Sequence, residues 1–282
     1  MNILISNDDG VNTPGIFAAK EAVKDLADVT VVAPEDNNSG VGRHLTMFKH
    51  LQVSSCELED NSPAYSVSGT PADSVVIGAN YIMDEKPDLV IAGINSGVNI
   101  SRKDLTSSGT VCAALEAVAM GIPAISVSLF MDYTSFEKDE DGNWHLNQDF
   151  ELSKKILKDC VLKIQKKGFP EGVDLFNLNI PSNCLSENIK ITRLSDKMLN
   201  KTVIDDKEDS LQEIFTYEFK NNTVPNEFIE DDTHKIVMIT SKLNESHEEG
   251  TDGHCLMVEK RPSLTPLNVD MSVPVSKLES WY

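Results

Sequence analysis

The sequence of 282 residues lacks the features that define several large classes of protein. Nowhere do about 18 apolar residues follow one another, so no transmembrane helix is expected. The first residues have neither the basic start nor the long apolar run of a signal peptide. The five cysteines are scattered, without a CxxC pair or zinc-like spacing, which favours reduced thiols. These absences predict a cytoplasmic protein.

Positive charge is also scarce, since 25 Lys and Arg stand against 45 Asp and Glu, for a net charge of −20 at pH 7. Affinity for nucleic acid polymers comes mainly from Lys and Arg that neutralise phosphates. Anionic membrane surfaces likewise attract basic segments. The composition therefore argues against nucleic acid polymers and membranes as partners. It does not exclude a small phosphorylated substrate, because a bound divalent cation reverses the local sign of the charge.

The first half of the chain alternates apolar segments with helical patterns. Strands are predicted at residues 2–6, 29–33, 88–92 and 124–129, and helices at residues 15–26, 70–82 and 110–120. Thr70 is positioned to cap the second of these helices, with Pro71 at its first position. Uninterrupted apolar strands that alternate with helices are typical of a parallel sheet covered on both faces. We therefore expect an α/β fold with a core in residues 1–130.

The second half has a different pattern. Residues 133–149 are polar and predict a solvated loop or hairpin, and a lysine-rich helix and a strand follow at residues 151–167 and 175–180. From Ile189 onward, short apolar runs are split by turns and charges, which is typical of β-rich structure with projecting arms. Residues 131–282 are thus predicted to form a smaller, β-rich extension, part of which packs back on the core.

Polar residues collect after the predicted strands, where open parallel sheets bind their ligands. Three of these strands end in loops with glycines and oxygen-bearing side chains, at residues 7–10, 34–40 and 93–99. The adjacent Asp8 and Asp9 repel each other unless positive charge lies beside them. Together with Ser39 and Asn95 they offer oxygen donors, which suit Mg²⁺ or Mn²⁺ better than zinc. Each residue alone is equally compatible with a turn or capping role, but their coincidence predicts a metal site.

Ser108, Gly109 and Thr110 stand at the start of a predicted helix. Amides and hydroxyls at a helix start bind phosphate readily, although serine and threonine also serve there simply as caps. Asn99 and Arg43 are further candidates for contacts to phosphate oxygens. The G-x-G-x-x-G, Walker A and G-x-S-x-G motifs are absent.

Taken together, these segments resemble the survival protein SurE family of nucleoside-monophosphate phosphatases. The matching segments keep their order and spacing over most of the chain: ILISNDDGVNTPG (residues 3–15), VVAPEDNNSG (31–40), GTPAD (69–73), PDLVIAGINSGVN (87–99), SGTV (108–111), GIPAIS (121–126), GTD (250–252) and SLTPL (263–267). The resemblance implies a Rossmann-like amino-terminal domain. It also implies a homodimer or homotetramer in which the subunits exchange carboxy-terminal elements.

The resemblance further implies one divalent cation per subunit, Mg²⁺ or Mn²⁺, bound by Asp8, Asp9, Ser39 and Asn95. The implied reaction is hydrolysis of nucleoside 5′-monophosphates, with 3′-monophosphates and short polyphosphate left open as substrates. Our hypothesis makes Asp8 the general base or nucleophile, while Asp9 chiefly binds the metal. The phosphoryl group would contact Asn99, Ser108, Gly109, Thr110 and Arg43.

Two other protein classes place acids after their first strand. A haloacid-dehalogenase-type phosphatase requires D-x-D, whereas residue 7 is Asn here. A receiver-like signalling module, which is not an enzyme, requires a phosphate-accepting aspartate after a later central strand, where this chain has Asn95. Both remain as weaker alternatives.

Overall fold

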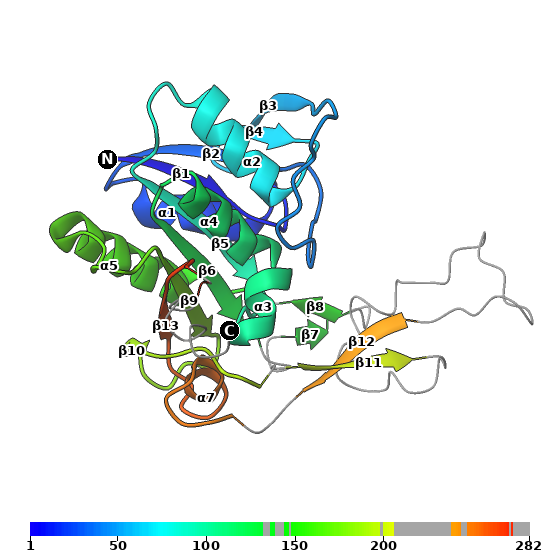
Figure 1. Cartoon of the computed structure of the whole chain (residues 1–282), viewed down its shortest axis with the longest axis vertical. Helices are drawn as coiled ribbons and strands as arrows, with labels where there is room; N and C mark the ends of the chain where they lie inside the picture. The colour runs from blue at the N-terminus through cyan, green and yellow to red at the C-terminus, as the bar shows by residue number, and fades with distance from the viewer. Residues whose placement is uncertain are drawn as a thin grey trace, which may run out of the picture.

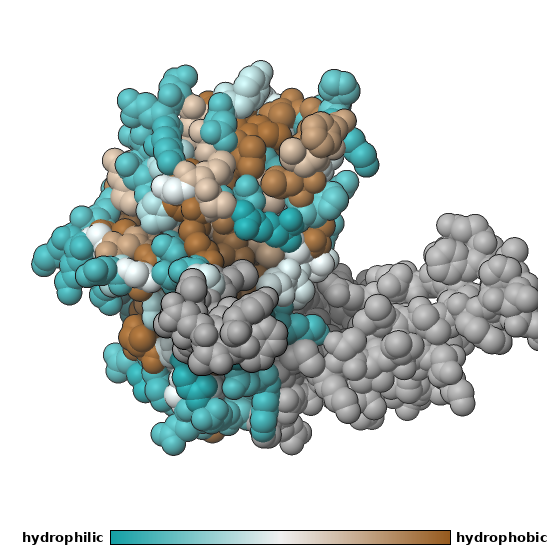
Figure 2. All heavy atoms as spheres, viewed as in Figure 1, coloured by the Kyte–Doolittle hydropathy of each residue, from teal (hydrophilic) through white to brown (hydrophobic). Residues whose placement is uncertain are grey.

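The computed structural model describes residues 1–131, 136–138, 144–146, 148–197, 200–205, 238–243, 247–270 and 272. Figure 1 shows a central sheet between helices, and a two-stranded ribbon that points away from it. None of the described helices is long and apolar enough to cross a membrane. Hydrophilic residues dominate the visible face around α5 (Glu151–Lys167) and α7 (Asp252–Met257) (Figure 2).

Parallel strands form the middle of this sheet. They are β1 (Asn2–Ser6), β2 (Asp28–Pro34), β4 (Pro63–Val67), β5 (Leu89–Ser96), β6 (Ala124–Phe130) and β9 (Leu175–Pro181). Their spatial order is β4-β2-β1-β5-β6-β9. Counted along the chain, that is the 3-2-1-4-5-6 order of the Rossmann fold. The predicted Rossmann-like, mostly parallel sheet is therefore confirmed.

Antiparallel strands extend the sheet at both edges. One edge is β3 (Val53–Glu57), which pairs with β4, and at the other β13 (Ser263–Leu267) pairs with β9. The short β10 (Lys190–Ile191) runs parallel to β13 and completes a nine-stranded sheet. Strands from both halves of the chain thus share one sheet. The division into units at residue 130 stays a prediction.

Helices cover both faces of the sheet, and each face has its own apolar cluster. Ile3 and Ile5 of β1 pack with α1 (Pro14–Val23) and α5 on one face. Leu4, which points the other way, packs with α2 (Pro71–Ile77) and α4 (Gly109–Ala119). Because alternate side chains of a strand face opposite sides, a central strand with both faces covered must be apolar throughout, as the sequence indicated.

Several predicted elements differ in detail. The helix predicted for residues 15–26 ends at Val23. The one predicted for residues 70–82 is α-helical only to Ile77 and continues as a π-helical turn, Gly78–Ile82, in which Met83 N–H donates to Gly78 O at 3.0 Å. Its start is as predicted, because Thr70 and Asp73 form a reciprocal capping box.

Other elements had no strong sequence signal. The β3–β4 hairpin and α3 (Ser101–Ser107) were not predicted. Within residues 133–149, β7 (Phe136–Lys138) and β8 (Trp144–Leu146) pair antiparallel, so the hairpin alternative is correct for the described part. The projecting ribbon in Figure 1 consists of β11 (Asn200–Asp205) and β12 (Met238–Leu243). Projecting arms were predicted from Ile189 onward, and residues 206–237 of that region lie outside the described residues.

The start of α1 packs directly on β5. A Cβ atom at Gly15 would lie 2.0 Å from the main-chain oxygen of Ile94. We therefore expect Gly15→Ala to lower the free energy of unfolding by about 2 kcal/mol or more, because backbone cannot yield as a side chain can. Urea unfolding monitored by circular dichroism measures this change.

Gly168→Ala is the matched control, since Gly168 has open space around it but a φ of 71°. There the cost should be about 1 kcal/mol, from backbone conformation alone. Equal losses in the two variants would show that the close approach of α1 to β5 has no energetic importance.

Candidate metal and phosphate site

Loops from several strands meet where the strand order reverses, between β1 and β5. In open α/β sheets this switch point, at the carboxyl ends of the strands, is where ligands bind. The main-chain N–H of Asn38, after β2, donates to Asp8 O at 2.7 Å. The N–H of Ser96, at the end of β5, donates to Asp9 Oδ2 at 3.1 Å. The three loops identified from the sequence are therefore neighbours.

The turn after β1 is organised by the buried side chain of Asn7. Its Nδ2 donates to Gly10 O and to Thr13 Oγ1, both at 2.9 Å, and its Oδ1 accepts from Gly10 N–H at 3.2 Å. Gly10 has a φ of 116°, which L side chains rarely adopt. Asn7 thus fixes the turn that presents Asp8 and Asp9, and has no spare donor for a substrate.

A bulge in β5 lies immediately before Asn95, near this edge of the sheet. The pairing with β6 shifts between Ala92 and Asn95, and such an insertion bends a strand and re-aims its side chains. Gly93 within the bulge has a φ of 131°, and a Cβ there would lie 2.3 Å from Val127 O. Only glycine fits, and Asn95 beyond it is buried.

The first turn of α4 lies directly against Asp8. Thr110 Oγ1 donates a short hydrogen bond to Asp8 Oδ1. A Cβ at Gly109 would lie 2.6 Å from the Cβ of Asp8 and 2.8 Å from its Oδ2. Three of the residues singled out from the sequence, from segments 100 residues apart, are thus in mutual contact.

Asp8 is buried next to a like charge. Asp8 is only 3% exposed to solvent. The pKa of the Asp8 carboxyl is raised to about 6, first by burial and second by the charge of Asp9, although hydrogen bonds from Thr110 lower it. No Lys or Arg in the described parts of the chain forms an ion pair with Asp8. A cation bound here would relieve the cost of both charges.

Asn99 is fixed by side chains of β9 and β6. Its carbonyl accepts from Nδ2 of Asn177 at 2.7 Å and of Asn179 at 2.9 Å, and its N–H donates to Asn179 Oδ1 at 2.9 Å. Asn99 Nδ2 donates to Ser128 Oγ at 2.9 Å. Sequence reasoning missed these buried partners. Two asparagines in an otherwise apolar strand were the signal that could have revealed them.

The remaining predicted residues are placed less directly. Ser108 Oγ accepts from Val111 N–H at 3.1 Å, so it is the N-cap of α4. Ser39 is exposed and follows Asn38, which bonds the main chain of Asp8. Arg43 does not reach the aspartates, because its Nε donates to Glu116 Oε2 on α4 at 2.8 Å.

The donor set fits a hard cation. Within the described ranges, no group of three or more His, Cys, Asp and Glu could hold a metal ion. The two carboxylates, with the Thr110 hydroxyl against Asp8, supply oxygen donors, which suit Mg²⁺ or Mn²⁺ and not a zinc site rich in thiolate or imidazole.

The sheet order defines an α/β protein of the Rossmann type, with an acidic candidate site at the ends of β1 and β5. Residues 3–201 match the family described as "Survival protein SurE", and the chain belongs to this family.

Known relatives support the assignment over the full length. A protein of Methanobrevibacter smithii named "5'-nucleotidase SurE" is 40% identical, over 100% of this chain and 99% of its own. One of the same name from Methanothermobacter thermautotrophicus is 49% identical over 71% of this chain and 75% of its own. The crystal structure of the SurE protein from Aquifex aeolicus superposes with a TM-score of 0.73 at 33% identity, covering 100% of this chain and 98% of that one.

The amide network around Asn99 generates a stability prediction. Asn179→Ala removes the side-chain oxygen that accepts from the Asn99 N–H and the side-chain NH₂ that donates to the Asn99 carbonyl. Both main-chain groups of Asn99 are buried. We expect the free energy of unfolding to fall by about 2 kcal/mol, because buried groups left without partners keep their desolvation cost. Chemical denaturation measures it.

The exposed Asn80→Ala serves as the control, since it loses one hydrogen bond to Val76 O and a weak one to Met120 Sδ. Its effect should stay within about 0.5 kcal/mol. An Asn179→Ala protein as stable as Asn80→Ala would mean that the network does not stabilise the 97–100 loop.

Proposed function

We propose that this protein is a metal-dependent phosphomonoesterase that hydrolyses nucleoside 5′-monophosphates to nucleoside and phosphate. The observation that carries the proposal is the buried Asp8 beside Asp9 at the switch point, with the start of α4 packed against it. The relative from Methanobrevibacter smithii named 5′-nucleotidase SurE, which matches over the whole chain, supports the choice of substrate.

Asp8, Asp9, Ser39 and Asn95 would bind one divalent cation, Mg²⁺ or Mn²⁺. When bound, such a cation polarises a phosphoryl oxygen and lowers the pKa of a water molecule. It also lets an acidic protein accept an anionic substrate, since it reverses the sign of charge at the site.

Asp8 acts in this proposal as the general base or as the nucleophile. The Thr110 hydroxyl donates to Asp8 Oδ1 and so orients the carboxylate that would accept a proton or attack phosphorus. Asp9 Oδ2 accepts from Ser96 N–H, so Asp9 is oriented by the main chain of β5. That difference supports a proton-transfer or nucleophilic role for Asp8 and a chiefly metal-binding role for Asp9.

The phosphoryl group would lie between the loop after β5 and the start of α4. In this proposal Asn99, Ser108, Gly109 and Thr110 would contact its oxygens through amide, hydroxyl and main-chain N–H groups, which suit phosphate. Arg43 uses only its Nε for Glu116, and its side chain is 45% exposed. Its terminal guanidinium nitrogens are therefore available for a phosphate that enters from solvent.

The alternative of a haloacid-dehalogenase-type phosphatase is disfavoured by Asn7. That position would have to be a reactive aspartate, whereas Asn7 is a buried turn residue here. Activity toward 3′-monophosphates or short polyphosphate, a preference between Mg²⁺ and Mn²⁺, and a homodimer or homotetramer with exchanged carboxy-terminal elements remain predictions. A panel of nucleotides, polyphosphate and metals, with light scattering for mass, tests them.

The metal and the two aspartates should be indispensable. We expect Asp8→Asn, Asp9→Asn and Asn95→Ala to lower kcat/KM for AMP or GMP by about 100-fold or more, because each removes a metal or proton contact. Chelation should abolish phosphate release, and added Mg²⁺ or Mn²⁺ should restore it.

Asp36→Asn is the control for loss of negative charge, since Asp36 is exposed in the loop after β2. It should keep nearly full activity. Undiminished hydrolysis by Asp8→Asn, or by chelated wild type, would contradict the proposal.

Thr110 offers a finer test of how Asp8 is oriented. Thr110→Val is isosteric but cannot donate to Asp8 Oδ1, so we expect kcat to fall about 10- to 100-fold. Thr110→Ser keeps the hydroxyl and should recover most of the rate. Steady-state kinetics with AMP compares the two, and equal rates in both variants would show that the hydrogen bond has no part in the reaction.

A further inference from the structure

Asp252, near the end of the chain, has a fully buried carboxylate that accepts three main-chain hydrogen bonds. Oδ1 accepts from the N–H groups of Ser195 and Gly253, both at 2.7 Å. Oδ2 accepts from the N–H of Ser101 at 2.8 Å. The side chain therefore joins α7 to two segments that are distant in sequence.

The contact to Ser101 reaches the proposed phosphoryl-binding segment. Ser101 is the first residue of α3 and follows Asn99 by two positions. It is fully buried and has a φ of 68°, a left-handed conformation that is strained for a residue other than glycine. Such conformations persist only where surrounding contacts impose them. The hydrogen bond to Asp252 is one such contact.

A second link strengthens this connection. Arg102 N–H donates to Ser195 O at 3.2 Å. The N–H of the same Ser195 donates to the Asp252 carboxylate. On the other side, Asn99 is fixed by Asn177 and Asn179 of β9. Residues 99–101 are thus held between β9 and the carboxy-terminal segment.

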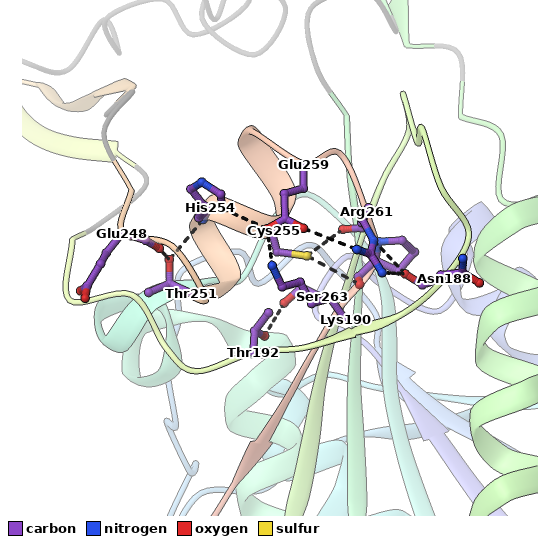
Figure 3. Close-up of polar contacts among 11 residues, drawn as sticks. Asn188, Lys190, Thr192, Glu248, Thr251, His254, Cys255, Glu259, Arg261 and Ser263 are labelled. Atoms are coloured by element: carbon purple, nitrogen blue, oxygen red, sulfur yellow. Dashed lines mark hydrogen bonds and ion pairs between the residues drawn. The ribbon is translucent and has the colours of Figure 1, made fainter.

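The capping of α7 does not require the Asp252 side chain. Thr251 is the N-cap, because its Oγ1 accepts from His254 N–H at 3.2 Å and donates to Glu248 O at 2.6 Å. Figure 3 shows these contacts at the start of α7. Of the three hydrogen bonds to Asp252, only that from Gly253 lies within the helix. The other two serve segments outside it.

We infer that Asp252 is a positioning residue for phosphate binding, which acts through Ser101 to set the place of Asn99. The inference rests on the proposed function. It assigns to the carboxy-terminal segment a role in the geometry of the substrate site, although Asp252 itself lies behind that site and touches no substrate.

Asp252→Asn tests the inference with the least change in shape. The amide oxygen can still accept from Ser195 and Gly253, which share one carboxylate oxygen. The amide NH₂ then faces the N–H of Ser101, and two donors repel. We expect KM for AMP to rise about tenfold or more with a smaller change in kcat, and the Ser101 amide to exchange hydrogen about tenfold faster.

Glu259→Gln is the matched control, the same acid-to-amide change in the same carboxy-terminal segment. It weakens contacts of Glu259 to Lys190, His254 and Arg261 (Figure 3). It leaves all three donors to Asp252 in place. We expect its KM and the exchange of Ser101 to match wild type, even where its melting temperature falls.

A raised KM with faster Ser101 exchange in Asp252→Asn alone supports the inference. A KM that changes equally in both variants, or not at all, overturns it while the proposed function stands. Wild type that releases no phosphate from AMP with Mg²⁺ or Mn²⁺ overturns both. Should Asp252→Asn not fold, wild-type exchange decides: slower exchange of Ser101 when AMP is added supports the inference, and unchanged exchange overturns it.

Discussion

The burial of the Asp8 carboxylate beside the like charge of Asp9 is the constraint on which the rest of this site depends. Asp8 is almost fully buried beside Asp9, and both burial and the like charge raise the pKa of Asp8. Folding into this arrangement costs free energy that a hydrophobic residue would not cost. Three neighbouring features hold Asp8 in place despite this cost: Asn7 fixes the turn, Thr110 donates a hydrogen bond to Asp8, and α4 approaches Asp8 closely at Gly109. In the proposed enzyme a bound cation would offset the repulsion. The free energy that the two carboxylates cost the folded protein would then favour metal binding.

Much of this fold could be predicted from the sequence, because its signals are local. Apolar runs marked the parallel strands other than β4, and Thr70 with Pro71 marked the start of α2. The Rossmann-like fold followed from the family resemblance, whereas Asp8 and Asp9 after the first strand had already indicated the acidic edge of the sheet. What could not be predicted depends on contacts between distant segments. The β5 bulge, for example, arises where Gly93 meets Val127 of the next strand.

The same distinction applies to the site. Asp8, Gly109 and Thr110 were named from local patterns, and the structure brings them together. Arg43 was named for its charge alone, and Glu116, 73 residues later, determines where its guanidinium group lies. The amides of β9 and the carboxylate of Asp252 were not found, because nothing in their own neighbourhoods indicates which loop they support. The loop at Asn99 is thus assembled from three regions of the chain.

The order of strands also has a consequence for how the chain is made. β6 is completed at Phe130, but its partner β9 begins only at Leu175. While a ribosome synthesises the residues between them, the nascent sheet ends in a seven-residue, largely apolar edge with unpaired main-chain groups. Such edges readily pair with other chains. The α5 helix and β9 therefore have to be synthesised, and β9 paired with β6, before the edge of the first half is protected against aggregation.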